Sequence, residues 1–204
     1  MPYSPKRLLL SVEKVSTFFK KYPNALGDAD FKVNGKSIPD TFHDLVSSLR
    51  KEIGESKTAS ESHSQIQKDI KELSRSLRIL GSDLEDALNA LLTLGNEPDK
   101  HIHLVRTKND LADFQNFSNQ MKDALPDAAE GEFVQKKATE FDEKLGAYDQ
   151  SLAKIGDAEK LKVQETIEAE NLSVQNRALA AALVWFCRRY LRGKNPELYR
   201  EFDK

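Results

Sequence analysis

The sequence is poor in the residues that mark disulfide-rich, fibrous or membrane-spanning proteins. A single cysteine, Cys187, excludes an internal disulfide and favours a reducing compartment. Only 9 glycines and 7 prolines occur in 204 residues, which excludes collagen-like and low-complexity proteins. The longest apolar run, Ala178 to Cys187, has ten residues, about half of what a transmembrane helix needs. Since no signal peptide is recognisable either, we expect a soluble, cytoplasmic protein.

The sequence also has no marked excess of positive or negative charge. The chain has 31 basic and 33 acidic residues, for a net charge of −2. No global field therefore attracts nucleic acid or an anionic membrane. Glycine-rich nucleotide loops and the Gly-x-Ser-x-Gly motif of hydrolases are absent as well, so we predict no cofactor.

What the sequence does contain is helical periodicity. We predict a first helix from Pro5 to Lys21, with Ser4 as N-cap. Its apolar stripe consists of Leu8, Val12, Val15, Phe19 and Tyr22. A connecting loop follows over residues 23–37, with extended structure near Val33 and a turn at Asn34-Gly35.

A longer pattern covers residues 40–94. Apolar residues alternate at spacings of four and three, a heptad seam typical of coiled-coil-like packing; they are Ile66, Ile70, Leu73, Leu77, Leu80, Leu84, Ala87, Leu91 and Leu94. Upstream, the same phase falls on Glu52, Ser56, Ala59 and His63, which are poor core residues. The segment is therefore either one helix with a polar waist or two helices broken near Gly54. The unbroken phase favours a continuous helix through Gly81.

Two further helices follow from the same pattern. The first runs from Glu97 to Leu125 and forms a hairpin with the preceding helix; its buried face is Leu104, Leu111, Phe114, Phe117, Met121 and Leu125.

The second runs from Gly131 to about Arg192, either as one helix or as two helices broken at Gly156-Asp157, with Gly193 as the C′ residue. A short helix starts at Asn195-Pro196 and ends at Phe202. The predicted buried residues of the long helix are Val134, Ala138, Phe141, Leu145, Tyr148, Leu152, Ile155, Val163, Ile167, Val174, Ala178, Ala181 and Trp185.

These elements predict an all-α, elongated antiparallel helical bundle with coiled-coil-like long helices. We expect a single domain, 1–204, with sub-regions 1–39, 40–155 and 156–204. The apolar run 178–187 is expected where the bundle is thickest, surrounded on all sides. The seam can be satisfied within one chain or between two.

Residues able to carry chemistry are few. On a helix, His101 and His103 point away from each other, and Asp40 with His43 lacks the Glu-x-x-His motif of di-iron bundles. We predict no metal site. Glu165, Glu168 and Glu170 are expected on a solvated face, and Cys187 in the core, so no catalytic residue is predicted.

Basic residues are the remaining candidates, for an anion or a partner protein: Lys68, Lys71, Arg75, Arg78, Arg188, Arg189 and Arg192. Against this role, Asp69 and Glu72 interrupt the first group, and no aromatic residues interleave for base stacking.

The sequence thus predicts a non-enzymatic scaffold or protein–protein interaction protein, whose partner is another protein or a second copy. One alternative is a membrane-active protein using residues 178–187. A weaker one is a nucleic-acid- or phosphate-binding accessory protein using the basic stripes.

Overall fold

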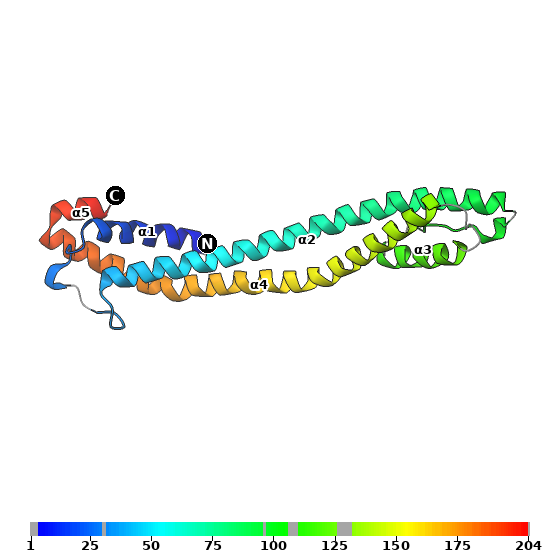
Figure 1. Cartoon of the computed structure of the whole chain (residues 1–204). Coiled ribbons are helices and arrows are strands. Elements are labelled where there is room, and N and C mark those ends of the chain that lie inside the picture. Colours follow the sequence, from blue (N-terminus) through cyan, green and yellow to red (C-terminus); the bar gives the residue numbers. More distant parts are fainter. Residues whose placement is uncertain (1–3, 30–31, 96, 106–109, 126–131, 204) are drawn as a thin grey trace. The chain divides into compact units, whose positions relative to one another are not determined.

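The computed structural model describes residues 4–29, 32–95, 97–105, 110–125 and 132–203 (Figure 1). These residues form α1 (Pro5–Lys21), α2 (Ile38–Leu94), α3 (Asp110–Ala124), α4 (Glu132–Lys194) and α5 (Pro196–Phe202), with 3₁₀ turns at Gly27–Ala29 and Pro98–Lys100. Within the described ranges the only β pairing is an isolated bridge between Val33 and Lys36. The all-α prediction is confirmed.

The chain divides into two compact units. Unit 1 comprises Met1–Glu61 and Lys160–Lys204, and unit 2 comprises Ser62–Glu159. Both α2 and α4 pass through the two units, so each unit contains a segment of each long helix. Within each unit the two segments run side by side in opposite directions (Figure 1).

The open question about residues 40–94 is answered by α2, which is continuous past both Gly54 and Gly81. Glu52 and Ser56 of the predicted polar waist face α4 in unit 1, whereas His63, which is buried, belongs to unit 2. In unit 1, Ala59 is buried, and the hydroxyls of Ser56 and Thr166 lie 3.5 Å apart. Polar contacts thus replace apolar ones without ending the helix.

Unit 2 has a core of leucines and aromatic rings. Leu77, Leu80 and Leu84 of the predicted seam are buried, but Leu94 is 81% exposed. Leu88 and Leu92 are buried instead, because the inward face of a helix with 3.6 residues per turn drifts from a strict seven-residue repeat. They pack with Phe114, Phe117, Met121, Phe141 and Tyr148.

The helix predicted from Glu97 is wrong in its first half. After the turn Pro98–Lys100, residues 101–105 are not helical, and α3 begins only at Asp110. In this segment Ile102 and Leu104 are buried while His101, His103 and Val105 are exposed, which is the period of extended chain.

Side chains supply the backbone partners that this extended segment needs. The Asn89 carboxamide pairs with Ile102 as a neighbouring strand would, accepting from its N–H (2.8 Å) and donating to its C=O (2.9 Å). Glu85 accepts from the N–H of Leu104 at 3.3 Å. Buried backbone groups must be paired, so these two residues of α2 make an extended chain stable here.

Unit 1 brings together the two ends of the described chain. Helix α1 has the predicted bounds, although Ser4 makes no side-chain cap. Rings from α1, α2 and α5 meet in this core: Phe18, Phe19, Phe42 and Phe202. The α5 prediction is confirmed, with the Asn195 side chain accepting from Leu198 N–H, but Gly193 lies inside α4 rather than ending it.

The largest correction concerns α4 after residue 155. The residues predicted to be buried there are exposed, with Val163 at 51%, Ile167 at 50%, Val174 at 73% and Trp185 at 60%; Ala178 and Ala181 are exposed as well. The inward face consists of Ala169, Ser173, Ala180, Leu183, Cys187 and Leu191. This part of α4 carries two apolar stripes, and the other one faces the core. The run 178–187 is therefore not enclosed on all sides. Among the described residues, no helix is both long and apolar enough to cross a membrane.

Candidate functional site

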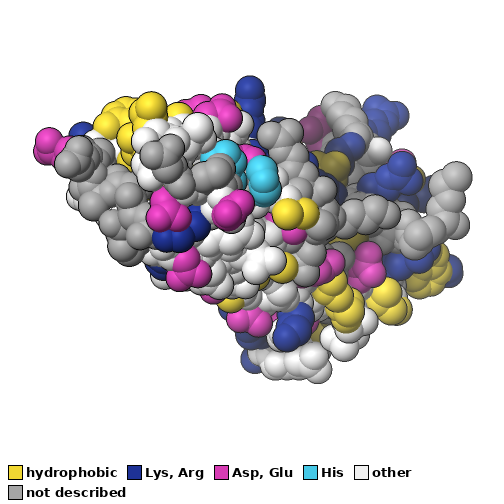
Figure 2. All heavy atoms as spheres, turned by 90° about the vertical axis from the view of Figure 1, so that its right-hand side faces the viewer, with side chains coloured by type: hydrophobic (Ala, Val, Ile, Leu, Met, Phe, Trp, Pro, Cys, Tyr) yellow, Lys and Arg dark blue, Asp and Glu magenta, His cyan; other side chains and the backbone are white. Residues whose placement is uncertain are grey.

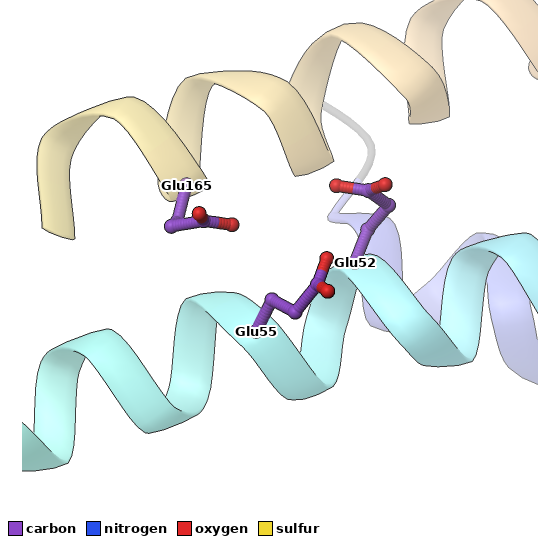
Figure 3. A group of neighbouring side chains, drawn as sticks. All are labelled: Glu52, Glu55 and Glu165. Carbon is purple, nitrogen blue, oxygen red and sulfur yellow. The ribbon is translucent and has the colours of Figure 1, made fainter. Parts of the chain in front are cut away.

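Three glutamates meet between α2 and α4 in unit 1. In Figure 3, Glu52 and Glu55 rise from α2 toward Glu165 of α4. One oxygen from each carboxylate lies within 4.8 Å of the others. The Oε2 atoms of Glu52 and Glu165 are shielded from water and have no hydrogen-bond partner among the residues that the structure describes.

The surroundings of Glu165 favour its protonated form. Burial raises the pKa of this carboxyl most, and the negative charges of Glu168, Glu55 and Glu52 raise the pKa further. Such a group can retain a proton that an exposed glutamate releases. Three carboxylates at this spacing are also the type of oxygen donors that hard divalent cations prefer.

The expectation of a solvated face for Glu165 is therefore wrong. Two signals were present in the sequence. Glu52 occupies the inward phase of α2, and Glu165 lies one turn before Ala169, which is buried. Recognising the cluster required the alignment of α2 with α4, which the sequence does not provide.

Two histidines, His101 and His103, connect the extended segment to α2 within unit 2. Figure 2 shows histidine side chains on the surface at this end of the molecule. His103 Nδ1 lies 3.0 Å from Glu85 Oε1, and His101 Nε2 lies 2.9 Å from Thr93 Oγ1. Each ring joins the extended segment to α2. In the part of the chain that is described, the three glutamates are the only cluster of three or more His, Cys, Asp or Glu with metal-ligand spacing.

Asp40 also has a structural role. It accepts from the Ser37 hydroxyl at 2.7 Å and its N–H donates to the same oxygen at 3.2 Å, which caps the start of α2.

Three of the four predicted basic residues of α2 lie around one hollow on the surface. Lys71, Arg75 and Arg78 line an open hollow of about 340 Å³, whereas Lys68 does not line it. Arg78 is bound to Asp110 of α3 and lies over the Phe114 ring at 5.7 Å. Because the carboxylate neutralises Arg78, the hollow offers the full charge of two cations rather than three.

The arginines at the end of α4 face different partners. Arg188 Nε lies 2.9 Å from Asp203 Oδ1, and Arg189 lies over the Trp185 ring at 5.4 Å. Arg192 is exposed. These residues hold α5 and cover an exposed ring, and they do not converge on one point.

A second apolar stripe follows the outside of α4 in unit 1. We define this outer face as Ile167, Asn171, Val174, Ala178, Ala181 and Trp185. All of these residues are exposed, and their spacing alternates between four and three. At about 100° per residue, the stripe lies roughly opposite the buried Ala169, Ala180 and Cys187. This part of α4 is thus apolar on two opposite sides.

Comparison of the chain with protein-family models, with curated proteins and with solved structures gives no match. The function must therefore be inferred from the residues themselves.

Proposed function

We propose that this protein is a non-enzymatic helical interaction protein that binds another helix through the outer face of α4. The observation that carries this proposal is the exposure of Ile167, Val174 and Trp185, at 50%, 73% and 60%, on one heptad-spaced stripe. Apolar residues with this spacing form the seam between paired helices, and contiguous exposed apolar patches mark interaction sites.

The remaining candidate residues support a binding role over a catalytic one. Cys187, the only thiol, is fully buried. A catalytic cysteine needs partial exposure and an electropositive setting. Of the candidate basic residues, Arg78 is bound to Asp110 of α3 and Arg188 to Asp203, so these two hold helices together.

Membrane attachment through residues 178–187 is the rival proposal, and two features oppose it. Leu183 and Cys187 of this run already lie in the core of unit 1. Glu168 and Glu170 are exposed beside the outer face and would be repelled by anionic lipid.

The binding proposal is tested by placing a photoreactive amino acid at Val174 in cells that produce the protein. We expect a covalent adduct with a polypeptide after irradiation. The matched control carries the same group at Gln150, an exposed residue of α4 in unit 2. Equal labelling at both positions, or none at Val174, would contradict the proposal.

The membrane proposal is tested with the purified chain and two kinds of vesicle, phosphatidylcholine alone and phosphatidylcholine with phosphatidylserine. We expect the protein to remain in the supernatant with both at low salt. Sedimentation with vesicles that is lost on Trp185→Glu would favour the membrane role instead.

A further inference from the structure

We propose that the hollow beside α2 in unit 2 binds a phosphate monoester, with the phosphoryl group between Lys71 and Arg75. The organic part of the ligand lies against Ile70 and Tyr148. All four residues line this hollow and belong to unit 2, whereas the outer face of α4 belongs to unit 1. The proposal therefore adds a second binding site and does not depend on the helix-binding function.

The acidic residues that alternate with the basic ones along α2 lie outside this hollow. Asp69 and Glu72 line a different hollow together with Lys144 of α4. The Asp69 carboxylate also accepts from the Gln65 carboxamide at 2.8 Å. Glu72 is three residues before Arg75, a spacing that permits an ion pair on a helix, yet the two side chains line different hollows. The negative charges that interrupt the basic group in the sequence are thus separated from it in the fold.

The two cations are placed to share one anion. Lys71 and Arg75 lie one turn apart on α2, and both are exposed. Neither forms an ion pair with any residue in the described part of the chain. Residues at this spacing have Cβ atoms about 6 Å apart, so their like charges repel each other. Both side chains are long enough to reach one anion between them, and such an anion would remove the repulsion.

The other polar groups of the hollow are already engaged. The Ser74 hydroxyl donates to Asp110 Oδ2 at 2.8 Å, and Arg78 binds the other oxygen of the same carboxylate. Asp110 is therefore neutralised, and it repels a nearby anion less than a free carboxylate would. Of the residues that line the hollow, Lys71 and Arg75 are the cations that still lack a counter-ion.

The charge and the shape of the hollow indicate the class of ligand. At pH 7 a phosphate monoester carries about 1.5 to 2 negative charges, which matches two cations better than a single carboxylate does. Arginine also binds phosphate oxygens through two parallel hydrogen bonds. Ile70 is half-buried and Tyr148 is buried, and both belong to the apolar core of unit 2. They offer an apolar surface to a small organic group, for which a hollow of about 340 Å³ has room.

The exposure of both cations predicts weak binding that depends on salt. An exposed ion pair contributes little free energy, and dissolved salt screens it further. We therefore expect a dissociation constant of about 1 mM at low ionic strength. Binding of this strength suits a small metabolite that is present at high concentration.

Nuclear magnetic resonance of the whole chain tests the site, with phenyl phosphate as the probe in low-salt buffer at neutral pH. We expect saturable shifts of the backbone amide signals of Lys71, Arg75 and Tyr148. The signals of Arg188 and Arg192, at the end of α4, should not move. Shifts of equal size at both places would mean non-specific attraction and would overturn the proposal, as would the absence of saturable shifts at the hollow.

Charge removal separates the hollow from the surrounding surface. Lys71→Ala and Arg75→Ala should each weaken phenyl phosphate binding by about two- to fivefold, the worth of one exposed ion pair. The matched control is Lys68→Ala, which removes the same charge from an exposed residue of α2 that does not line the hollow. It should leave the dissociation constant unchanged. Equal weakening by Lys68→Ala would refute the assigned position of the phosphoryl group. Circular dichroism checks that the variants remain folded.

Two related probes test the two halves of the ligand. Phenyl sulfate has nearly the same shape as phenyl phosphate but a single charge, and inorganic phosphate has the charge without the ring. Both should bind more weakly than phenyl phosphate. Equal affinity for phenyl sulfate would contradict the match between two cations and a doubly charged group. Equal affinity for inorganic phosphate would contradict the contact with Ile70 and Tyr148. Neither result bears on the labelling expected at Val174 in unit 1.

Discussion

The two units are built on the same pair of helices and each has an apolar core between α2 and α4, but in unit 1 one stretch of this contact is lined by carboxylates. In unit 2, Leu77 and Leu84 of α2 belong to one apolar core with Phe141 of α4. In unit 1, Glu52 and Glu55 face Glu165. Both stretches of α2 belong to one uninterrupted helix.

The difference shows that helix continuity and helix packing have separate causes in this protein. A helix forms its own backbone hydrogen bonds whatever its side chains contact. Stability from burial depends on the apolar area removed from water, so it is greater around Leu77 than around the glutamates. We expect the stretch with the three glutamates to open locally at a lower free energy than the core of unit 2.

The largest expected effect comes from truncating the core of unit 2. Leu77 is fully buried, and Leu77→Ala should lower the free energy of unfolding by about 2–5 kcal/mol. The matched control, Lys71→Ala, lies one to two turns away on the exposed surface and should change it by less than about 0.5 kcal/mol. Urea unfolding measures both, and equally small effects would mean that the core is misassigned.

Removing the Asn89 carboxamide should have the next largest effect. Asn89→Ala leaves the N–H and C=O of the buried Ile102 without their partners, at an expected cost of about 1–3 kcal/mol. Asn119→Ala, at an exposed position of α3, is the control and should be neutral or slightly stabilising. If the two variants unfold at the same urea concentration, the extended segment does not depend on Asn89.

Two glycines of α2 test how tightly each unit is packed. A Cβ at Gly81 in unit 2 would lie 2.9 Å from Leu104 Cδ2 and 3.3 Å from Phe141 Cε2, while one at Gly54 in unit 1 meets nothing within 4 Å. Gly54→Ala should therefore stabilise the protein by about 0.5–1 kcal/mol through helix propensity. Gly81→Ala should lose that gain to overpacking and destabilise by about 1 kcal/mol. Equal stabilisation by both would contradict the close approach at Gly81.

The smallest effect, and the only one that depends on pH, is expected from Glu165→Gln. Because the pKa of Glu165 is raised in the folded state, the folded chain keeps a proton that the unfolded chain releases. Stability is therefore lost as the pH rises from the ordinary glutamate pKa through the raised one. The glutamine variant cannot ionise, so its melting temperature should exceed that of the unaltered protein at pH 7 and equal it at pH values below the ordinary pKa.

Glu143→Gln, at an exposed position of α4 in unit 2, is the control for this experiment and should show no such divergence. A lower melting temperature for Glu165→Gln at pH 7 would mean that the carboxylate stabilises the fold and that the repulsion inferred here is wrong.

Most of the helices could be predicted from the sequence, because their signals are local. Pro5 and Pro196 mark helix starts, and the regular spacing of leucines carries α2 through Gly81. The extended segment at 101–105 could not be predicted, since its partners are side chains 13 and 19 residues upstream. The outer face of α4 shows the same limit. Two stripes have suitable spacing, and the choice between them depends on where α1 and α2 lie.

The sequence identified individual candidate residues but not which of them come together in the fold. Lys71, Arg75 and Arg78 share one face of α2, but Asp110, which neutralises Arg78, belongs to another helix. Glu165 faces α2 only because the two long helices are aligned so that Glu52 and Glu55 lie opposite it. Contacts of this kind depend on the relative position of distant segments, which periodicity does not specify.

The composition of the two units also determines when each one can form during translation. Unit 2 is a single stretch of chain, Ser62–Glu159, so all of it can leave the ribosome while the remaining residues are still being added. Unit 1 joins residues made before unit 2 to residues made after it, with Phe18 of α1 against Phe202 of α5. The nascent α1 therefore lacks its contacts with α5 until residues up to Phe202 have been made, and during that interval the Phe18 ring is accessible to chaperones.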